Sequence, residues 1–141
     1  MTEPTNQGQA SNLLAQAIEF RKAFELSNDF SVAGFALQQR LISEEYYEVI
    51  GACAESIDQN FNVVSRVELL KELGDLVFVC FQMASYMGLD LNEAMKRIFE
   101  SNMSKLDKNG KPIRREDGKV LKGPDYQPPC LVDLISDQSS S

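Results

Sequence analysis

The chain has 141 residues, of which 43% are hydrophobic and 25% charged, a balance typical of one soluble globular domain. Its 14 Lys and Arg against 21 Asp and Glu give a net charge of −7, which argues against a nucleic acid or an anionic membrane contacted over the whole surface. The absence of histidine excludes His-ligated zinc, Ser-His-Asp triads and Cys-His nucleophiles, so any chemistry must use carboxylates, cations and metal ions.

The periodicity of apolar residues predicts four helices. We place them at residues 13–26, 32–57, 67–87 and 92–106. Gly88 is a suitable stop for the third helix, and Asp90 followed by Glu93 is the capping-box pattern that begins the fourth. Residues 76–81 are also consistent with a buried strand, but the apolar pattern continues to residue 87 and favours a helix.

Beyond residue 106 the sequence changes to Asn-Gly, Asp-Gly, Gly-Pro and Pro-Pro. This composition predicts a β-hairpin with its turn at residues 115–118. We expect one domain at residues 13–129, with flexible segments at 1–12 and 130–141. The net charge changes from −9 over residues 1–95 to +5 over residues 96–122, so a basic segment follows an acidic body.

Carboxylates gather on the second predicted helix. Glu44, Glu45 and Glu48 fall within a sector about 100° wide, because a helix advances by about 100° per residue. A solvated face is the usual explanation for such a cluster. However, Leu37, Leu41 and Ala52 lie on the same sector, and no Lys or Arg occurs between residues 41 and 65 to neutralise it.

The third predicted helix carries Glu72 and Asp75 at the end of an otherwise apolar segment. Gly74 would let a backbone or a ligand approach these acids, although a packing glycine is the simpler interpretation. Carboxylates gathered on packed helices take up protons or hold a cation, and oxygen ligands favour Mg²⁺ or Mn²⁺. A ferritin-like di-iron bundle would require Glu-x-x-His motifs, which this chain lacks.

Polar residues also interrupt the fourth predicted helix, where Asn102 falls inside the apolar stripe and Lys105 lies at its edge. Asn102 would either bond to a neighbouring helix or point towards a ligand's sugar or phosphate oxygens. Six cations follow in the hairpin region: Lys108, Lys111, Arg114, Arg115, Lys119 and Lys122. Such a basic hairpin is most often a solubility feature, but beside acids that hold Mg²⁺ it could hold phosphates.

The three cysteines, Cys53, Cys80 and Cys130, show no CxxC spacing, and their odd number does not suggest a disulfide framework. The first twelve residues lack the basic and apolar regions of a secretory signal, and the longest apolar run is far too short to cross a bilayer. We therefore expect a cytoplasmic protein with reduced cysteines.

The pattern Glu44-Glu45-x-x-Glu48 followed by Glu72-x-x-Asp75 resembles the EExxE…ExxD motif of the all-α nucleoside triphosphate pyrophosphohydrolases. That superfamily includes MazG-like proteins, dimeric dUTPases, dCTPases and phosphoribosyl-ATP pyrophosphohydrolases. Residues 101–105 (SNMSK) and 118–129 (GKVLKGPDYQPP) are similar to the C-terminal portion of MazG-like members. The resemblance covers residues 13–129 and implies an all-α, four-helix MazG-like bundle with a C-terminal hairpin, assembled as a homodimer or a dimer of dimers.

The resemblance implies hydrolysis of a nucleoside triphosphate between its α and β phosphates, which gives a nucleoside monophosphate and pyrophosphate. By motif position, two or three Mg²⁺ or Mn²⁺ ions would be held by Glu44, Glu48, Glu72 and Asp75. Glu45 would orient or deprotonate the attacking water. The contacts to the nucleotide would come from Asn102, Lys105, Lys119, Lys122 and Tyr126, without nucleic acid or membrane as a partner.

The chain departs from the family at the base pocket, because it has no tryptophan. Four phenylalanines near the N-terminus could stack on a base, although core packing is favoured for each: Phe20, Phe24, Phe30 and Phe35. The compact chain with its basic tail most resembles phage-type members, including the MazZ branch that supplies guanine monophosphates. We therefore expect dGTP or GTP as substrate, with dUTP, dCTP and phosphoribosyl-ATP as alternatives. A reading of another class is a non-catalytic helical dimer whose acidic groove binds a basic partner.

Overall fold

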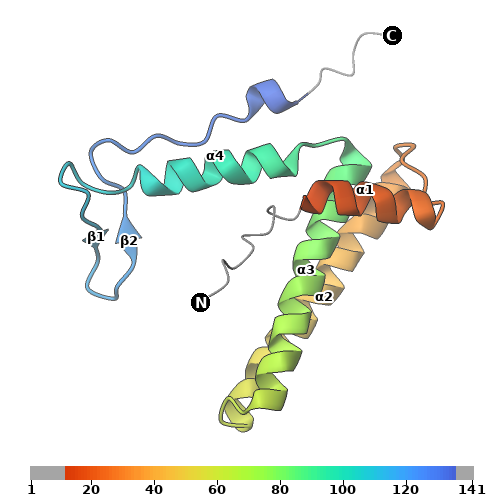
Figure 1. Ribbon diagram of the computed structural model, residues 1–141, viewed down its shortest axis with the longest axis horizontal. Coiled ribbons are helices and arrows are strands. Elements are labelled where there is room, and N and C mark those ends of the chain that lie inside the picture. The colour runs from red at the N-terminus through yellow and green to blue at the C-terminus, as the bar shows by residue number, and fades with distance from the viewer. Residues whose placement is uncertain (1–11, 136–141) are drawn as a thin grey trace, which may run out of the picture. The chain divides into compact units, whose positions relative to one another are not determined.

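The computed structural model describes residues 12–135 and is dominated by α-helices (Figure 1). These are α1 (Leu13–Ala23), α2 (Val32–Asp58), α3 (Val63–Met87) and α4 (Leu91–Met103). Two short strands, β1 (Ile113–Arg114) and β2 (Val120–Leu121), and the 3₁₀ helix η1 (Val132–Leu134) follow. The predicted all-α class is confirmed, and residues 76–81 are helical. None of the helices in the described part is long and apolar enough to cross a membrane.

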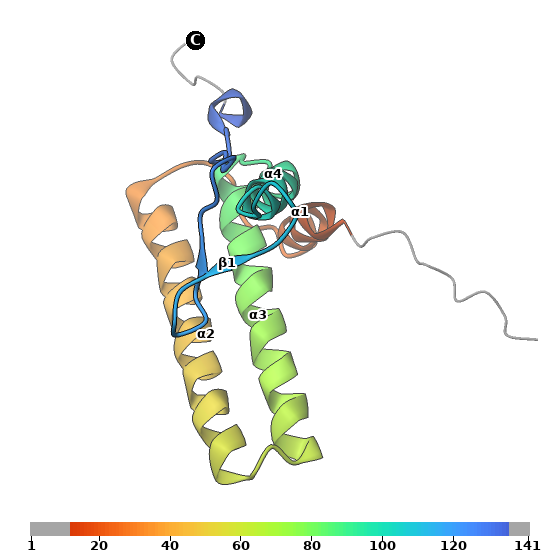
Figure 2. The same ribbon diagram turned by 90° about the vertical axis from the view of Figure 1, so that its left-hand side faces the viewer.

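Residues 12–88 form one compact unit, and residues 89–135 belong to a second. In the first unit α2 and α3 lie side by side and antiparallel, and α1 packs against α3 (Figure 2). The face of α2 that packs carries Gln38, Val49, Ala52 and Ser56, all of them buried. Because these residues recur at helical spacing, Glu45 lies on the same line, one turn before Val49.

Side-chain contacts set the ends of the long helices. Asn62 caps α3 by accepting a hydrogen bond from the Ser65 N–H at 2.8 Å, so α3 begins one turn earlier than periodicity predicts. The predicted stop and start after it are confirmed. Gly88 ends α3 in the left-handed conformation at φ 66°, and Asp90 accepts from the Glu93 N–H at 3.0 Å.

The second unit contains the predicted hairpin. Ile113 pairs with Leu121 and Arg114 with Val120, and the Gly118 N–H donates to the Arg115 carbonyl at 2.8 Å to close the turn. Gly123 is required beyond the hairpin, because an added Cβ would lie 2.6 Å from the Lys105 carbonyl oxygen.

The segment after the hairpin lies along α4. The Ser101 hydroxyl donates to the Gln127 carbonyl at 2.7 Å, and Arg97 pairs with Asp133 at 2.6 Å. Within residues 130–135, which we predict to be part of a flexible tail, the Cys130 carbonyl and Asp133 both contact Arg97. The rest of the predicted flexible segments, residues 1–11 and 136–141, lies outside the described residues.

Candidate metal centre

Three carboxylates from the two longest helices meet in the first unit. Glu45 of α2 and Glu72 and Asp75 of α3 each offer an oxygen, and these oxygens lie within 4.8 Å of one another. Residues three apart on a helix share a face, so Glu72 and Asp75 both point at α2. The antiparallel register of the pair then brings Glu45 opposite them. The two halves of the sequence motif are thus joined by helix packing.

Two of the carboxylate oxygens are buried without a hydrogen-bond partner among the described residues. Oε2 of Glu45 and Oε2 of Glu72 find no hydrogen-bond partner within the described part of the chain. Lys71 Nζ contacts only the outer side of the group, at 3.2 Å from Glu72 Oε1 and 2.9 Å from Asp75 Oδ2, and its side chain is 59% exposed. Buried carboxylate oxygens without partners are costly, and a hard cation that binds oxygen satisfies them. The donor set therefore fits a divalent ion such as Mg²⁺ or Mn²⁺.

The carboxyl groups around Glu72 shift one another's pKa values. A hydrogen bond to Glu72 and the charge of Glu45 raise the pKa of Glu48. A hydrogen bond to Glu72 also raises the pKa of Glu68, while the bond from Glu68 lowers the pKa of Glu72. The pKa of Glu72 is thus lowered while those of Glu48 and Glu68 are raised, and a cation bound beside them would lower the raised values.

Three of the five predicted acids, Glu45, Glu72 and Asp75, are brought together, and Glu48 is exposed and lies outside this group, although Glu72 raises its pKa. Glu44 is exposed and lies outside the group of three oxygens. Glu68 was not predicted. The signal for it was available, because it precedes Glu72 by four residues and so lies on the same face of α3.

The predicted nucleotide contacts all belong to the second unit. Asn102 is exposed in this unit, and the buried polar residue is its neighbour Ser101. Lys122 Nζ lies 4.8 Å from the centre of the Tyr126 ring, so these two predicted residues contact each other. Lys105 is half-buried and Lys119 is exposed. Their roles at a triphosphate stay predictions.

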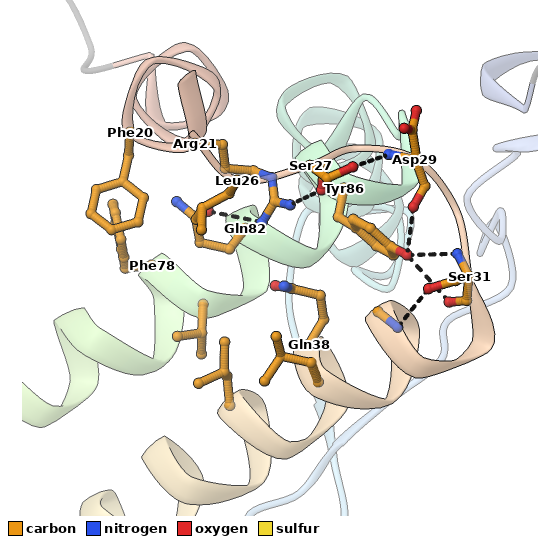
Figure 3. Close-up of a pocket in the computed structure, with 14 residues that line it drawn as sticks. Phe20, Arg21, Leu26, Ser27, Asp29, Ser31, Gln38, Phe78, Gln82 and Tyr86 are labelled. Carbon is orange, nitrogen blue, oxygen red and sulfur yellow. Dashed lines mark hydrogen bonds between the residues drawn. The ribbon is translucent and has the colours of Figure 1, made fainter. Parts of the chain in front are cut away.

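A cavity of about 520 Å³ opens between α1, α2 and α3 (Figure 3). Leu41 and Val79 line it, and each lies one helical turn, about 6 Å, from an acid of the metal centre. Of the four phenylalanines considered for base stacking, Phe20 alone lines this cavity among the described residues. Phe24 and Phe30 are 65% and 61% exposed, so the prediction of core packing fails for them.

The paired motif, the all-α fold and the carboxylate cluster can be compared with known proteins. No curated protein matches the chain significantly. The family model described as phosphoribosyl-ATP pyrophosphohydrolase matches residues 14–102, which span α1 to α4 and include every acid of the metal centre. Since this match covers more than half of the chain, the protein belongs to the phosphoribosyl-ATP pyrophosphohydrolase family, within the all-α MazG-like superfamily of nucleoside triphosphate pyrophosphohydrolases.

Proposed function

We propose that the protein hydrolyses a nucleoside triphosphate to a nucleoside monophosphate and pyrophosphate in a reaction that depends on Mg²⁺ or Mn²⁺. One observation carries the proposal: Glu45 and Glu72, on facing helices, each bury a carboxylate oxygen that lacks a partner in the described residues, next to Asp75. In a chain of this family, a divalent ion is the group that such oxygens accommodate.

The position of each carboxylate determines its proposed role at the metal site. Glu45, Glu72 and Asp75 would hold the ion directly, and Glu48 would join them on losing its proton. Two or three ions per site is the number that the resemblance to the superfamily implies. The geometry favours Glu45 over Glu44 as a ligand, because Glu44 is exposed and outside the group.

The chemistry needs a nucleophile and a charge-neutralised phosphate. A bound Mg²⁺ ion lowers the pKa of water and screens the phosphate charge. Glu45 would orient the water and accept its proton, since its carboxylate lies beside Glu72 and Asp75. The water oxygen bonds to the α-phosphorus, the bond from that phosphorus to the α–β bridging oxygen breaks, and pyrophosphate leaves. No histidine is required, in agreement with the sequence.

Phosphate recognition is assigned to the second unit. Its proposed contacts carry cations or hydrogen-bond donors: Asn102, Lys105, Lys119, Lys122 and Tyr126. The net charge of +5 over residues 96–122 supports an anionic ligand for this part of the chain.

We favour a purine nucleoside triphosphate as the substrate. The resemblance to phage-type members favours dGTP or GTP, and the family match favours phosphoribosyl-ATP, which carries the same triphosphate on an adenine nucleotide. The pyrimidine substrates dUTP and dCTP are the alternative.

Association of two or four copies is part of the proposal. An apolar stripe runs along α3 at helical spacing through Val63, Val67, Leu70 and Val77, which are 65%, 61%, 71% and 46% exposed. A second copy packed on this stripe would remove it from water. We also propose that the protein acts in the cytoplasm.

A substrate panel tests the activity. Each candidate, namely dGTP, GTP, dUTP, dCTP and phosphoribosyl-ATP, is incubated with Mg²⁺ or Mn²⁺, and pyrophosphate and single phosphate are both measured. We expect pyrophosphate and a monophosphate in equal amounts. Release of single phosphate, or no turnover of any nucleotide together with binding of a basic peptide, would contradict the proposal and favour the non-catalytic alternative.

A further inference from the structure

The cavity between α1, α2 and α3 has apolar walls and a polar end. Phe20 of α1 and Phe78 of α3 meet edge to face on one side of it, with ring centres 5.1 Å apart. Leu37 and Leu41 of α2 complete the apolar lining. A planar ring can lie against such walls, because aromatic and branched side chains bury its faces without needing hydrogen bonds.

Two buried amides point into this cavity from opposite helices (Figure 3). Gln38 of α2 and Gln82 of α3 are only 6% and 4% exposed. Within residues 12–135, Gln38 Oε1 and Gln82 Nε2 have no hydrogen-bond partner. The cavity thus presents one unpaired acceptor and one unpaired donor. Buried polar atoms of this kind nearly always form a hydrogen bond, here with a group outside the described residues.

Arg21 decides which end of the Gln82 amide faces the cavity. Arg21 Nη1 donates to Gln82 Oε1 at 3.5 Å, and a guanidinium can only donate, so the amide must turn its oxygen towards Arg21. Gln82 Nε2 is left as the free donor. Arg21 is itself held, because its Nε donates to Asn28 Oδ1 at 2.7 Å and its Nη2 to the Ser27 carbonyl at 2.8 Å.

We infer that this cavity holds the base of the nucleotide, with Gln82 donating to an acceptor on the base edge and Gln38 accepting from an adjacent N–H. Arg21 is then a positioning residue: it fixes the orientation of the Gln82 amide and so determines which edge of the base can form hydrogen bonds with it. The inference rests on the proposed function, since it assumes that the phosphates lie at the metal centre one turn away.

The inferred ligand is a base with an acceptor next to a donor. Guanine offers O6 and N1–H, and an adenine that is unsubstituted at N1 offers N1 and the N6 amino group. An unsubstituted purine ring keeps the shape but lacks the donor. A site built around unpaired polar groups discriminates strongly against a ligand that cannot satisfy them.

The first test compares purine riboside triphosphate with the purine nucleoside triphosphate that the unchanged protein hydrolyses best. We expect kcat/KM for the unsubstituted analogue to be about 10- to 100-fold lower, the effect of leaving one buried polar group unpaired. This comparison uses no variant, so it stands even if a substitution impairs folding.

The second test removes the amides. In Gln38→Met and Gln82→Met, the ratio of the two kcat/KM values should fall close to 1, because the hydrogen bond that distinguishes the two bases is lost. Gln39→Met is the matched control, since Gln39 is exposed on the same helix as Gln38 and should keep the ratio. Arg21→Met should reduce the ratio and Arg21→Lys, which keeps a donor, should restore part of it.

The outcomes separate the inference from the function on which it rests. Two results would overturn the proposed role of the amides in base recognition without affecting the proposed activity. The first is pyrophosphate release with an equal kcat/KM for both analogues. The second is a ratio of the two kcat/KM values that does not change in folded Gln38→Met and Gln82→Met variants. If no triphosphate is hydrolysed, binding of guanosine and adenosine without metal is measured by calorimetry. Binding that Gln38→Met weakens about 10-fold or more would support the site, and no binding would overturn it.

Discussion

Glu72 is the most buried carboxyl group of the metal centre, and its surroundings explain why a cation belongs there. It is 6% exposed, one of its oxygens contacts Lys71, and the other has no partner in the described residues. The exposed ammonium of Lys71 neutralises the outer side, while the inner side is left with carboxyl groups alone. Negative charge is therefore concentrated on this side, and Glu72 raises the pKa of both Glu48 and Glu68.

Exchanging single acids separates the roles of the adjacent pair Glu44 and Glu45. Glu45→Gln should reduce pyrophosphate release by at least about 100-fold, the usual contribution of a positioned base, whereas Glu44→Gln should have a much smaller effect because Glu44 is exposed. Steady-state kinetics at saturating Mg²⁺ measures both. A larger loss of pyrophosphate release in Glu44→Gln than in Glu45→Gln would contradict this assignment and indicate that Glu44 is the metal ligand, as the motif position implies.

Glu48 should make the metal-free protein less stable as the pH rises. Its pKa in the folded chain is raised, so its contribution to stability is complete below the unfolded-state pKa and is lost as the pH rises through the folded-state value. Glu48→Gln should therefore raise the melting temperature without metal at pH 7 and reduce the stabilisation that Mn²⁺ gives. Thermal unfolding from pH 4 to 8, with exposed Glu55→Gln as control, measures this. A lower metal-free melting temperature in Glu48→Gln would contradict it.

At the scale of the element, apolar periodicity was sufficient to locate the helices, because each buries one face, and the turn residues located the hairpin. It did not fix their ends, since these depend on single side chains such as Asn62 at the start of α3. Apolar periodicity also could not predict the register of α2 against α3, and this register brings Glu45 close to Glu72. Gln82 is a polar residue within the apolar part of α3, but only its contact with Arg21 shows which of its amide atoms is unpaired.

Two glycines of α2 should respond oppositely to alanine. A Cβ at Gly34 would collide with the Tyr86 hydroxyl, which accepts the Ser31 N–H at 2.9 Å, so Gly34→Ala should destabilise the fold by about 1–3 kcal/mol. A Cβ at Gly51 meets nothing within 4 Å, and Gly51→Ala should stabilise it by up to about 1 kcal/mol. Urea unfolding measures both. Equal effects would show that Tyr86 does not pack against Gly34 in solution.

The segment after the hairpin should leave α4 in acid. The hydrogen bond from Arg97 lowers the pKa of Asp133, so this contribution is present above the unfolded-state pKa and is lost as the pH falls through the folded-state value. Asp133→Asn should speed hydrogen exchange over residues 127–134 at neutral pH, where Asp125→Asn, an exposed control, should not. Because Asp133 is 62% exposed, the expected effect is local. Unchanged exchange in Asp133→Asn would show that this ion pair does not hold the segment.

For the whole molecule, the exposed apolar stripe of α3 is the feature that a single copy leaves unexplained. Leu70→Glu should dissociate the oligomer, because it places a charge at the most exposed position of the stripe. Light scattering on a size-exclusion column gives the mass before and after, and exposed Gln39→Glu on α2 serves as control. A monomeric mass for the unchanged protein would contradict the proposed association.

The central claim is that acids from two packed helices form a divalent metal site. Crystals soaked in Mn²⁺ and measured at the manganese absorption edge test it most directly, because the anomalous signal locates the ion independently of turnover. We predict a peak between the carboxylates of Glu45, Glu72 and Asp75 that disappears in Glu72→Gln. A map without a peak there at saturating Mn²⁺, with Lys71 still paired to Glu72 and Asp75, would contradict the account.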